Sequence, residues 1–370
     1  MKFSCEKYIL QAACTIASRA TASKSPIPAL EGLLIEADAG VKITGYDLKK
    51  GIYTSVEADV AETGSAVVGA RLFGEMMRRL PDGIVAVSSD GNDNINVKCG
   101  KSEFNFMGMA AADYPEMPVV DSVNNIALPQ KILKSMINQT IFAVSDSDVR
   151  PIYTGTLFEI DGDELTLVSV DGYRLAKRSE KLESAEMENC SFVVPGSALS
   201  DIEKVCADED KAVKISVGSK HISFTVGDTV IVTRRLEGEF LNYRKSIPDN
   251  FRYKIEVERS EFMATIDRVA LIVSEKNSSP VRICFNDGTI DCFCVTPIGK
   301  AEDVCTCDGS GEGLEIGFND RYLMDALKAA GTDRLDICVN TASSPCIITA
   351  ADGSEKFTYM ILPVRLRSGE

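Results

Sequence analysis

The chain has 370 residues and a formal net charge of −15, with 40 Lys and Arg against 55 Asp and Glu. This charge argues against an open basic surface for nucleic acid, although it leaves room for a segregated basic face. No apolar run approaches the ~20 residues that a membrane helix needs. Glu6 and Lys7 interrupt the stretch that a secretory signal would require, and the twelve Cys stand in apolar surroundings typical of buried thiols. We therefore expect a cytoplasmic protein.

Three similar passages follow one another along the chain. Each begins with an apolar pattern that predicts an amphipathic helix, within residues 8–16, 132–141 and 262–270. A pair of apolar strands around a turn follows each helix, predicting hairpins within residues 32–48, 155–175 and 281–295. The corresponding positions Ile35, Phe158 and Ile283 stand 123 and 125 residues apart. The repeat is therefore about one domain long.

A second predicted helix recurs in each passage, within residues 70–80, 197–207 and 320–330. At ~100° per residue, the first copy gathers Leu72, Phe73, Met76 and Leu80 on one face. Two cations lie opposite this apolar face in the first copy, Arg71 and Arg78, and two in the third copy, Arg321 and Lys328. In the second copy, the same two positions are occupied by Ser197 and Lys204. A solvated helix face explains any single cation. Recurrence at Arg78, Lys204 and Lys328 favours a shared function.

The second passage contains the stretch 170–176, VDGYRLA, at the end of an alternating strand expected over residues 164–170. Asp171-Gly172 predicts a turn. The turn is followed at a sheet edge by an aromatic, a cationic and an aliphatic residue that could form a shallow peptide-binding pocket: Tyr173, Arg174, Leu175. A plain strand–turn–strand corner explains the local chemistry more simply, because Asp-Gly pairs are common turn signals.

Further alternating strands follow each second helix, so each passage reads as helix, hairpin, helix and hairpins. This order predicts an α+β fold in which two helices cover one face of antiparallel sheets, repeated three times in an arc. Short polar connections after DYPEMP and RKSIPDN place the expected domains at residues 1–121, 122–249 and 250–370.

Several stretches carry a family resemblance when they are read in order. They are PDG at 81–83, ADYP at 112–115, VDGYRLA at 170–176, GEFLNYRKSIP at 238–248, SEKN at 274–277, IGFNDRYLMDAL at 316–327 and YMILPVRL at 359–366. With the threefold repeat, the whole chain resembles the β sliding clamps, the β subunits of bacterial DNA polymerase III.

This resemblance implies a non-catalytic processivity factor without a cofactor. Two chains would form a head-to-tail homodimeric ring of six domains, with helices lining a hole around duplex DNA and sheets outside. The ring would tether the polymerase, the clamp loader and repair proteins through short peptides. An acidic exterior would then coexist with basic helix faces that contact phosphates without regard to sequence.

The resemblance also implies a peptide pocket between the second and third domains, with an apolar floor for Leu and Phe anchors. The matching positions are Tyr153, Gly172, Tyr173, Arg174, Leu175, Leu241, Lys245, Ser246, Met360, Leu362, Pro363, Val364 and Arg365. The chain departs from the family pattern at Val170, at Leu241 and at Lys245-Ser246. These departures bear on peptide preference.

The implied DNA contacts combine the repeated helix cations with two loop positions: Lys24, Arg71, Arg78, Arg150, Lys204, Arg321 and Lys328. Lys24 and Arg150 rest on family position alone. The implied dimer contact sets the second helix and a strand of domain one against the first helix of domain three: Met76, Leu80, Phe104, Ile272 and Val273. Packing within their own cores is the alternative, above all for Met76 and Leu80 on the apolar stripe.

A metal-dependent cytosolic enzyme is the rival hypothesis, built on two CxC pairs: Cys292, Cys294, Cys305 and Cys307. Four thiolates can hold zinc, but CxC lacks the usual ligand spacing, and buried packing on one strand face explains the pairs as well. Residues 161–164, DGDE, are too short for a calcium loop. His221 is the single histidine and is expected at a solvated hairpin tip. No P-loop, Rossmann, GxSxG or HExxH pattern occurs.

Overall fold

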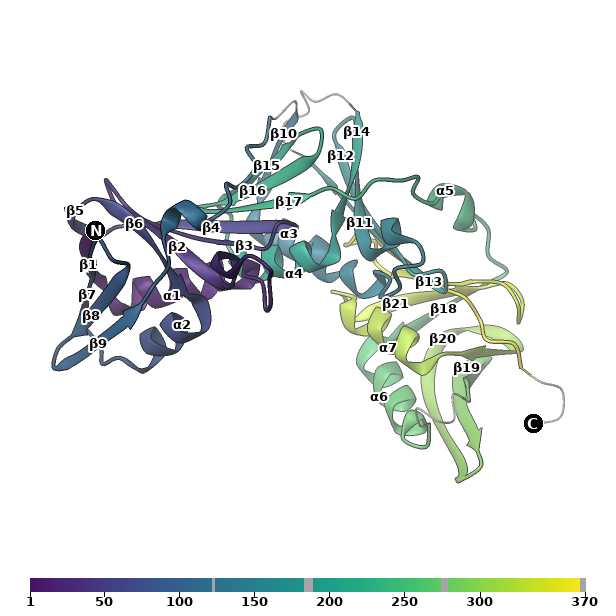
Figure 1. The fold of residues 1–370 in the computed structure, drawn as a ribbon. Coiled ribbons are helices and arrows are strands. Elements are labelled where there is room, and N and C mark those ends of the chain that lie inside the picture. The colour runs from purple at the N-terminus through teal and green to yellow at the C-terminus, as the bar shows by residue number, and fades with distance from the viewer. Residues whose placement is uncertain (122–123, 183–188, 274–278, 367–370) are drawn as a thin grey trace. The chain divides into compact units, whose positions relative to one another are not determined.

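The computed structural model describes residues 1–121, 124–182, 189–273 and 279–366 (Figure 1). The chain forms two compact units. The first combines Met1–Lys134 with Ser197–Arg235, and the second combines Ser135–Gly196 with Leu236–Glu370. No helix in the described ranges is long and apolar enough to cross a membrane.

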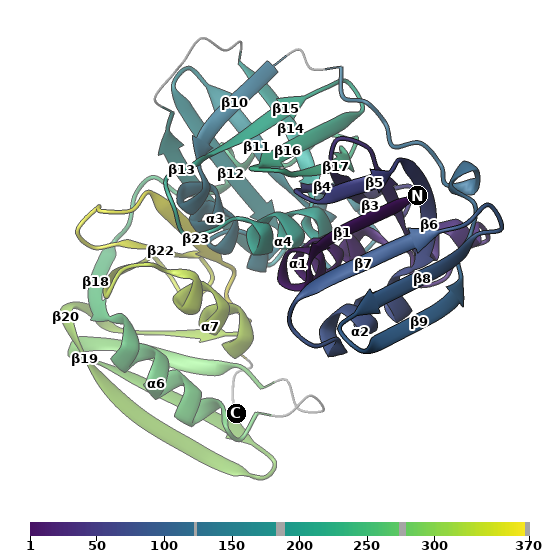
Figure 2. The ribbon, with the colours of Figure 1, turned by 90° about the vertical axis from the view of Figure 1, so that its left-hand side faces the viewer.

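The first unit contains two antiparallel sheets. The five-stranded sheet has the order β5 (Asp59–Glu62), β1 (Lys2–Glu6), β7 (Ile84–Ser89), β8 (Asn94–Cys99), β9 (Ser102–Met107), and Figure 2 shows β7, β8 and β9 side by side. The eight-stranded sheet has the order β10 (Asn124–Pro129), β15 (Ala212–Val217), β16 (His221–Val226), β17 (Thr229–Arg234), β4 (Lys50–Val56), β3 (Val41–Tyr46), β2 (Gly32–Ala37), β6 (Gly64–Gly69). The pair β17–β4 joins a strand of the second passage to a strand of the first.

Helices α1 (Lys7–Ala17) and α2 (Ala70–Arg79) pack against each other and share one core with both sheets. The core stripe of α2 consists of Phe73 and Met77, followed by Leu80. The prediction that Leu72 belongs to this stripe is wrong, because half of its surface is exposed (50%). Residues four and seven after Phe73 share its face of the helix, whereas its neighbour Leu72 is turned by ~100°. Met76 is partly buried at the margin.

The second passage supplies α3 (Gln130–Asn138) and α4 (Gly196–Val205), and the third supplies α6 (Arg259–Ala270) and α7 (Asp320–Ala329). Helices α6 and α7 pack side by side (Figure 1). The predicted two helices per passage are thus confirmed. A short helix that the sequence did not reveal, α5, spans Tyr243–Ser246. Short 3-10 helices span Ser18–Ala20, Pro28–Glu31, Ala111–Asp113, Ile141–Ala143 and Pro151–Thr154.

The second unit is built on one ten-stranded sheet. Its order is β14 (Cys190–Pro195), β11 (Gly155–Asp161), β12 (Glu164–Val170), β13 (Arg174–Lys181), β23 (Phe357–Ile361), β22 (Cys346–Ala350), β21 (Arg334–Val339), β18 (Tyr253–Glu258), β20 (Gly299–Phe318), β19 (Val281–Thr296). The pair β13–β23 joins the second passage to the third. Each long sheet therefore combines strands from two passages, and the boundaries at 121/122 and 249/250 stay a prediction.

The predicted hairpin within residues 281–295 is wrong. Strand β19 passes through Asn286-Asp287-Gly288 without reversing, and its register with β20 shifts on either side of Asp287. Gly288 has a φ of +71°, which suits a β-bulge as well as a turn. The chain reverses instead after Thr296, which pairs with Gly299.

The CxC cysteines lie in β19 and β20. Cys292, Cys294 and Cys305 are buried, and Cys307 is half-buried. Burial raises the pKa of all four thiols, that of Cys305 to about 12, so the thiolate that zinc requires is disfavoured. In the described part of the chain, no group of three or more His, Cys, Asp or Glu is placed to hold a metal ion.

Candidate functional site

The turn between β12 and β13 presents Tyr173 to solvent. Asp171 Oδ1 accepts hydrogen bonds from the backbone N–H groups of Tyr173 (2.8 Å) and Arg174 (3.0 Å). Gly172 has a φ of +96°, a conformation that favours glycine. The Tyr173 side chain is 62% exposed and stacks on Tyr322 of α7, with ring centroids 6.1 Å apart. The predicted Asp-Gly turn is confirmed.

Arg174 is held firmly at the start of β13. Its Nε donates to Asp171 Oδ2 (2.9 Å) and its Nη1 to Asp325 Oδ2 on α7 (2.6 Å). The guanidinium also lies over the ring of Tyr322, 4.5 Å from the centroid, and its side chain is only 11% exposed. Arg174 therefore positions the turn against α7, and its charge is already matched by two carboxylates.

The C-terminal segment lies beside this turn, as the sequence led us to expect. Strand β23 pairs with β13 so that Leu175 stands opposite Met360, and the Leu362 N–H donates to the Tyr173 carbonyl (2.9 Å). Val364, which follows Pro363, is also held by a backbone contact. Its N–H donates to the Gly317 carbonyl (2.8 Å), so only its side chain is available.

We define the C-terminal strand surface as the thirteen residues predicted to bind a peptide. They differ in exposure. Leu175 and Met360 are buried in an apolar cluster, against which Tyr153 and Leu241 also pack. The half-buried members are Tyr153, Arg174, Leu241, Ser246 and Pro363, and the exposed members are Gly172, Tyr173, Lys245, Leu362, Val364 and Arg365. The structure thus brings all thirteen into the second unit, with an apolar base and a margin that exposes both apolar and charged side chains.

The segment that carries Leu241 and Lys245 is fixed by a contact that the sequence did not reveal. Tyr243 of α5 donates its hydroxyl to Glu159 Oε2 (2.5 Å), and Arg244 donates to Glu159 Oε1 (2.9 Å). Burial raises the pKa of Glu159, but the hydrogen bonds from Arg244 and Tyr243 outweigh it and leave the pKa lowered. Burial and the Glu159 carboxylate raise the pKa of Tyr243. The adjacent Tyr243 and Arg244 were the only sign in the sequence that this segment could bind a carboxylate.

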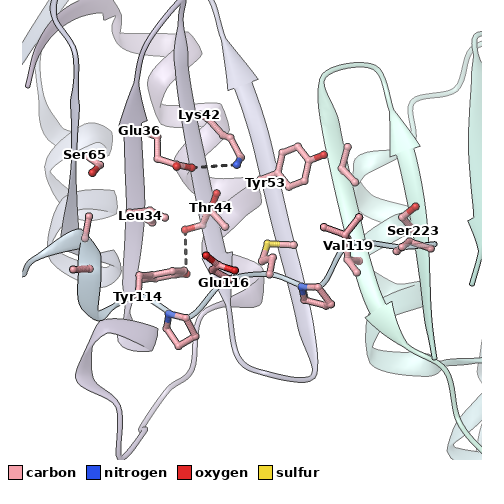
Figure 3. A pocket seen from close by; sticks show the side chains of 18 of the residues that line it. Leu34, Glu36, Lys42, Thr44, Tyr53, Ser65, Tyr114, Glu116, Val119 and Ser223 are labelled. Atoms are coloured by element: carbon pink, nitrogen blue, oxygen red, sulfur yellow. Dashed lines mark hydrogen bonds and ion pairs between the residues drawn. The ribbon is translucent and has the colours of Figure 1, made fainter. Parts of the chain in front are cut away.

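A cavity of about 980 Å³ lies in the first unit, between the eight-stranded sheet and residues 111–120 (Figure 3). Tyr114 in this segment donates to the Thr44 carbonyl of β3 (3.2 Å). The cavity occupies the same place in the first repeat as the C-terminal strand surface does in the second. Leu34 and Thr44, which line the cavity, are paired across two strands, and the equivalent pair in the second repeat, Leu157 and Val168, lies in the apolar cluster with Leu175 and Met360. Sequence reasoning missed this cavity.

The two counterparts differ at one central position. Gly51 of β4 corresponds to Leu175 of β13, since they pair with Tyr46 and Val170 at the ends of equivalent strands. Met117 packs so close to Gly51 that a Cβ there would lie 2.4 Å from the Met117 Cε. In the first unit, the Met117 side chain thus occupies the space that the Leu175 side chain fills in the second unit.

The seven predicted DNA contacts are all exposed: Lys24, Arg71, Arg78, Arg150, Lys204, Arg321 and Lys328. On α2, Arg78 is exposed while Phe73 and Met77 are buried; on α7, Lys328 is exposed while Leu323 and Leu327 are buried. These cations therefore lie outside the buried stripe of each helix, as predicted, although the stripe of α2 contains Met77 and not Leu72. Arg78 pairs with Glu75 in its own helix (2.6 Å), and Arg150 lies over the Tyr153 ring.

The predicted dimer contacts divide into two groups. Phe104 is exposed on β9, one of the two edge strands of the five-stranded sheet, and Met76, Ile272 and Val273 are partly buried. Leu80 is 4% exposed within the core, which favours the alternative that it packs inside its own domain. The last position of the apolar stripe is covered by its own domain.

Comparison with known proteins assigns the family. Residues 1–118, 127–242 and 244–365 match the N-terminal, central and C-terminal domains of the DNA polymerase III beta subunit. The Beta sliding clamp of Staphylococcus aureus (strain Mu50) is 32% identical over 358 residues, 94% of each chain.

Solved structures agree. The DNA polymerase sliding clamp from Bacillus subtilis is 30% identical with a TM-score of 0.95, over 99% of this chain and 100% of that one. The DNA polymerase III beta subunit from Thermotoga maritima is 28% identical with a TM-score of 0.91 over the same shares. The predicted α+β fold of three tandem clamp domains is confirmed, and the chain belongs to the family of the DNA polymerase III beta subunit, the beta sliding clamp.

Proposed function

We propose that this chain is a non-catalytic DNA sliding clamp, a homodimeric ring that encircles duplex DNA in the cytoplasm and confers processivity on a polymerase. One observation carries the proposal. In each of the three repeats, the second helix buries an apolar stripe and exposes a cation at the same position: Arg78, Lys204, Lys328. Exposed cations on successive helices suit phosphate contacts that are independent of base sequence.

Ring closure joins domain 1 (1–121) of one protomer to domain 3 (250–370) of the other, with domain 2 (122–249) between them. Strand β9 supports this arrangement, because it is a sheet edge with Phe104 and Met107 exposed. An unpaired edge with exposed apolar side chains favours pairing with another chain. Ile272 and Val273 follow α6 in domain 3 and are partly buried, so part of their apolar surface is available to a partner.

The C-terminal strand surface is the proposed docking site for the polymerase, the clamp loader and repair proteins. Tyr173, Leu362 and Val364 expose apolar surface around a turn and a strand end that hydrogen bonds hold in place. A short peptide with Leu and Phe anchors matches such a surface, while Lys245 and Arg365 offer charges at its margin.

Comparing circular with linear DNA distinguishes a ring that encircles the duplex from a protein that only binds to its surface. A bacterial clamp loader is used to load labelled protein onto nicked circular plasmid, which is then passed through gel filtration at high salt. A closed ring stays on circular DNA and is lost after a restriction cut, because it slides off the ends. Mass measurement of the free protein should give twice the chain mass. Equal retention on circular and linear DNA would contradict encirclement.

A further inference from the structure

Two junctions between successive repeats are held by equivalent ion pairs. In the first unit, Lys50 at the start of β4 pairs with Asp201 of α4, and their side chains are 12% and 10% exposed. In the second unit, Arg174 at the start of β13 pairs with Asp325 of α7 (2.6 Å). The partners stand 151 residues apart in both cases. Each pair joins a strand of one repeat to the second helix of the next.

The turns before the two cations are built alike. Asp47 N–H donates to the Lys50 carbonyl (3.1 Å), and Asp171 N–H donates to the Arg174 carbonyl (3.3 Å). Each aspartate side chain also accepts the backbone N–H of the cation that follows it. The last residue of each preceding strand pairs with the residue after the cation: Tyr46 with Gly51, and Val170 with Leu175.

In both turns the two paired residues are five positions apart, and the same spacing identifies the third cation position, although β19 continues one residue further, to Thr296. In the third repeat, Val295 pairs with Lys300 across the turn that joins β19 to β20. The residue before Lys300 is Gly299, so a glycine stands where Lys50 and Arg174 stand in the other repeats. Lys300 is not a substitute. It lies one residue further along the strand, where alternation turns it to the opposite face, and it pairs with Glu302 (2.5 Å).

The carboxylate position is present in all three repeats. Asp201 is the sixth residue of α4 and Asp325 the sixth of α7, and the sixth residue of α2 is Glu75. The repeat that precedes α2 lies in another protomer if the ring is head-to-tail. Within its own helix, Glu75 pairs with Arg78 (2.6 Å) and Arg79 (3.1 Å).

We propose that the seam between protomers lacks the ion pair that holds both junctions within the chain, because Gly299 of one subunit meets Glu75 of the other where a cation would complete the pair. This inference rests on the proposed head-to-tail dimer. Gly299 therefore weakens the contact between subunits relative to the two junctions within the chain.

A matched pair of variants tests whether a cation at position 299 strengthens the dimer. Gly299→Lys supplies the missing cation, whereas Gly299→Gln supplies a similar chain without charge. Gly299 has a φ of +155°, so both side chains bear the same backbone strain and the comparison cancels it. We expect the lysine variant to dimerise about tenfold more tightly than the glutamine variant, the effect of an ion pair of ~1.4 kcal/mol.

Dimer dissociation constants and subunit-exchange rates provide the readout, in the wild type and in a Glu75→Gln background. The tenfold difference should vanish with Glu75→Gln and shrink at high salt. Equal affinities of the lysine and glutamine variants, with the wild type still dimeric, would overturn the inference and leave the proposed function standing. A lysine effect that persists without Glu75 would also overturn it. A wild type that is monomeric at all concentrations would instead contradict the proposed ring.

Discussion

Glu159 illustrates how a single carboxylate organises the segment next to the C-terminal strand surface. It lies on β11, and it accepts hydrogen bonds from Tyr243 and Arg244 of α5. These contacts fix the chain between β17 and β18, where Leu241 and Lys245 lie. The outcome for Arg174 is similar, because its two carboxylate partners make it a support for the turn rather than a free charge.

We predict that the stabilisation from Glu159 is lost in acid. Its pKa is lowered on folding, so its contribution is complete above the ordinary value of 4.5 and disappears as the pH falls through the lowered value. Glu159→Gln should destabilise the protein by roughly 1–3 kcal/mol at neutral pH. Thermal unfolding of both proteins across pH should show the gap narrowing below the ordinary value. The exposed Glu237→Gln serves as the control, and a gap that is constant in pH would contradict the assignment.

At the scale of elements, β23 decides whether the C-terminal strand surface exists. This strand pairs with β13 of the preceding repeat on one side and with β22 on the other. A chain end that stays apolar through Ile361 and Leu362 would expose that surface if it were not paired. The ladder therefore turns the end of the chain into part of a site.

Deleting residues 363–370 should weaken peptide binding by at least about tenfold, because it removes the exposed side chains beyond β23 but keeps the ladder. Fluorescence polarisation with a labelled peptide carrying Leu and Phe anchors measures the affinity. The truncated protein should still be a dimer. Since the deletion also removes the Val364–Gly317 hydrogen bond, the double variant Leu362→Ala and Val364→Ala tests the side chains alone. Unaltered affinity in both would place the partner site elsewhere.

On the scale of the whole molecule, the charge distribution separates two kinds of surface. The chain carries a net charge of −15, yet the outward face of each second helix carries a cation. Other exposed lysines lie on strands, among them Lys98 of β8, Lys181 of β13 and Lys214 of β15. The proposed ring assigns DNA contact to the helix cations only.

Reversing Arg78, Lys204 and Lys328 to Glu should weaken DNA association and flatten its salt dependence. Each lost phosphate contact lowers the slope of log affinity against log salt by ~0.9, so the triple variant should lose up to about 3 per protomer. Fluorescence anisotropy with labelled duplex over a salt series gives the slope. Reversing Lys98, Lys181 and Lys214 makes the same change in net charge and should have little effect. If both triple variants behaved alike, net charge and not the helix faces would govern binding.

The amino-acid sequence by itself determined the threefold repeat, the two helices of each passage and the exposed cations, because these depend on local periodicity. It also indicated that the stretches around Tyr173 and Met360 meet, through the family resemblance. Local patterns failed where several conformations suit the same residues. Gly288 with its positive φ serves a bulge as readily as a turn, and Leu72 looked like a core residue until packing fixed the stripe on Phe73 and Met77.

Only the tertiary structure decided which residues of different repeats meet. The ladder of β13 with β23, the contact of Tyr243 with Glu159 and the ion pairs of Lys50 and Arg174 each join positions that are far apart in the chain. No local preference specifies such partners, because each lysine, arginine or tyrosine is equally compatible with solvent. The long sheets that cross from one repeat to the next impose these contacts, since strand register fixes which side chains stand opposite each other.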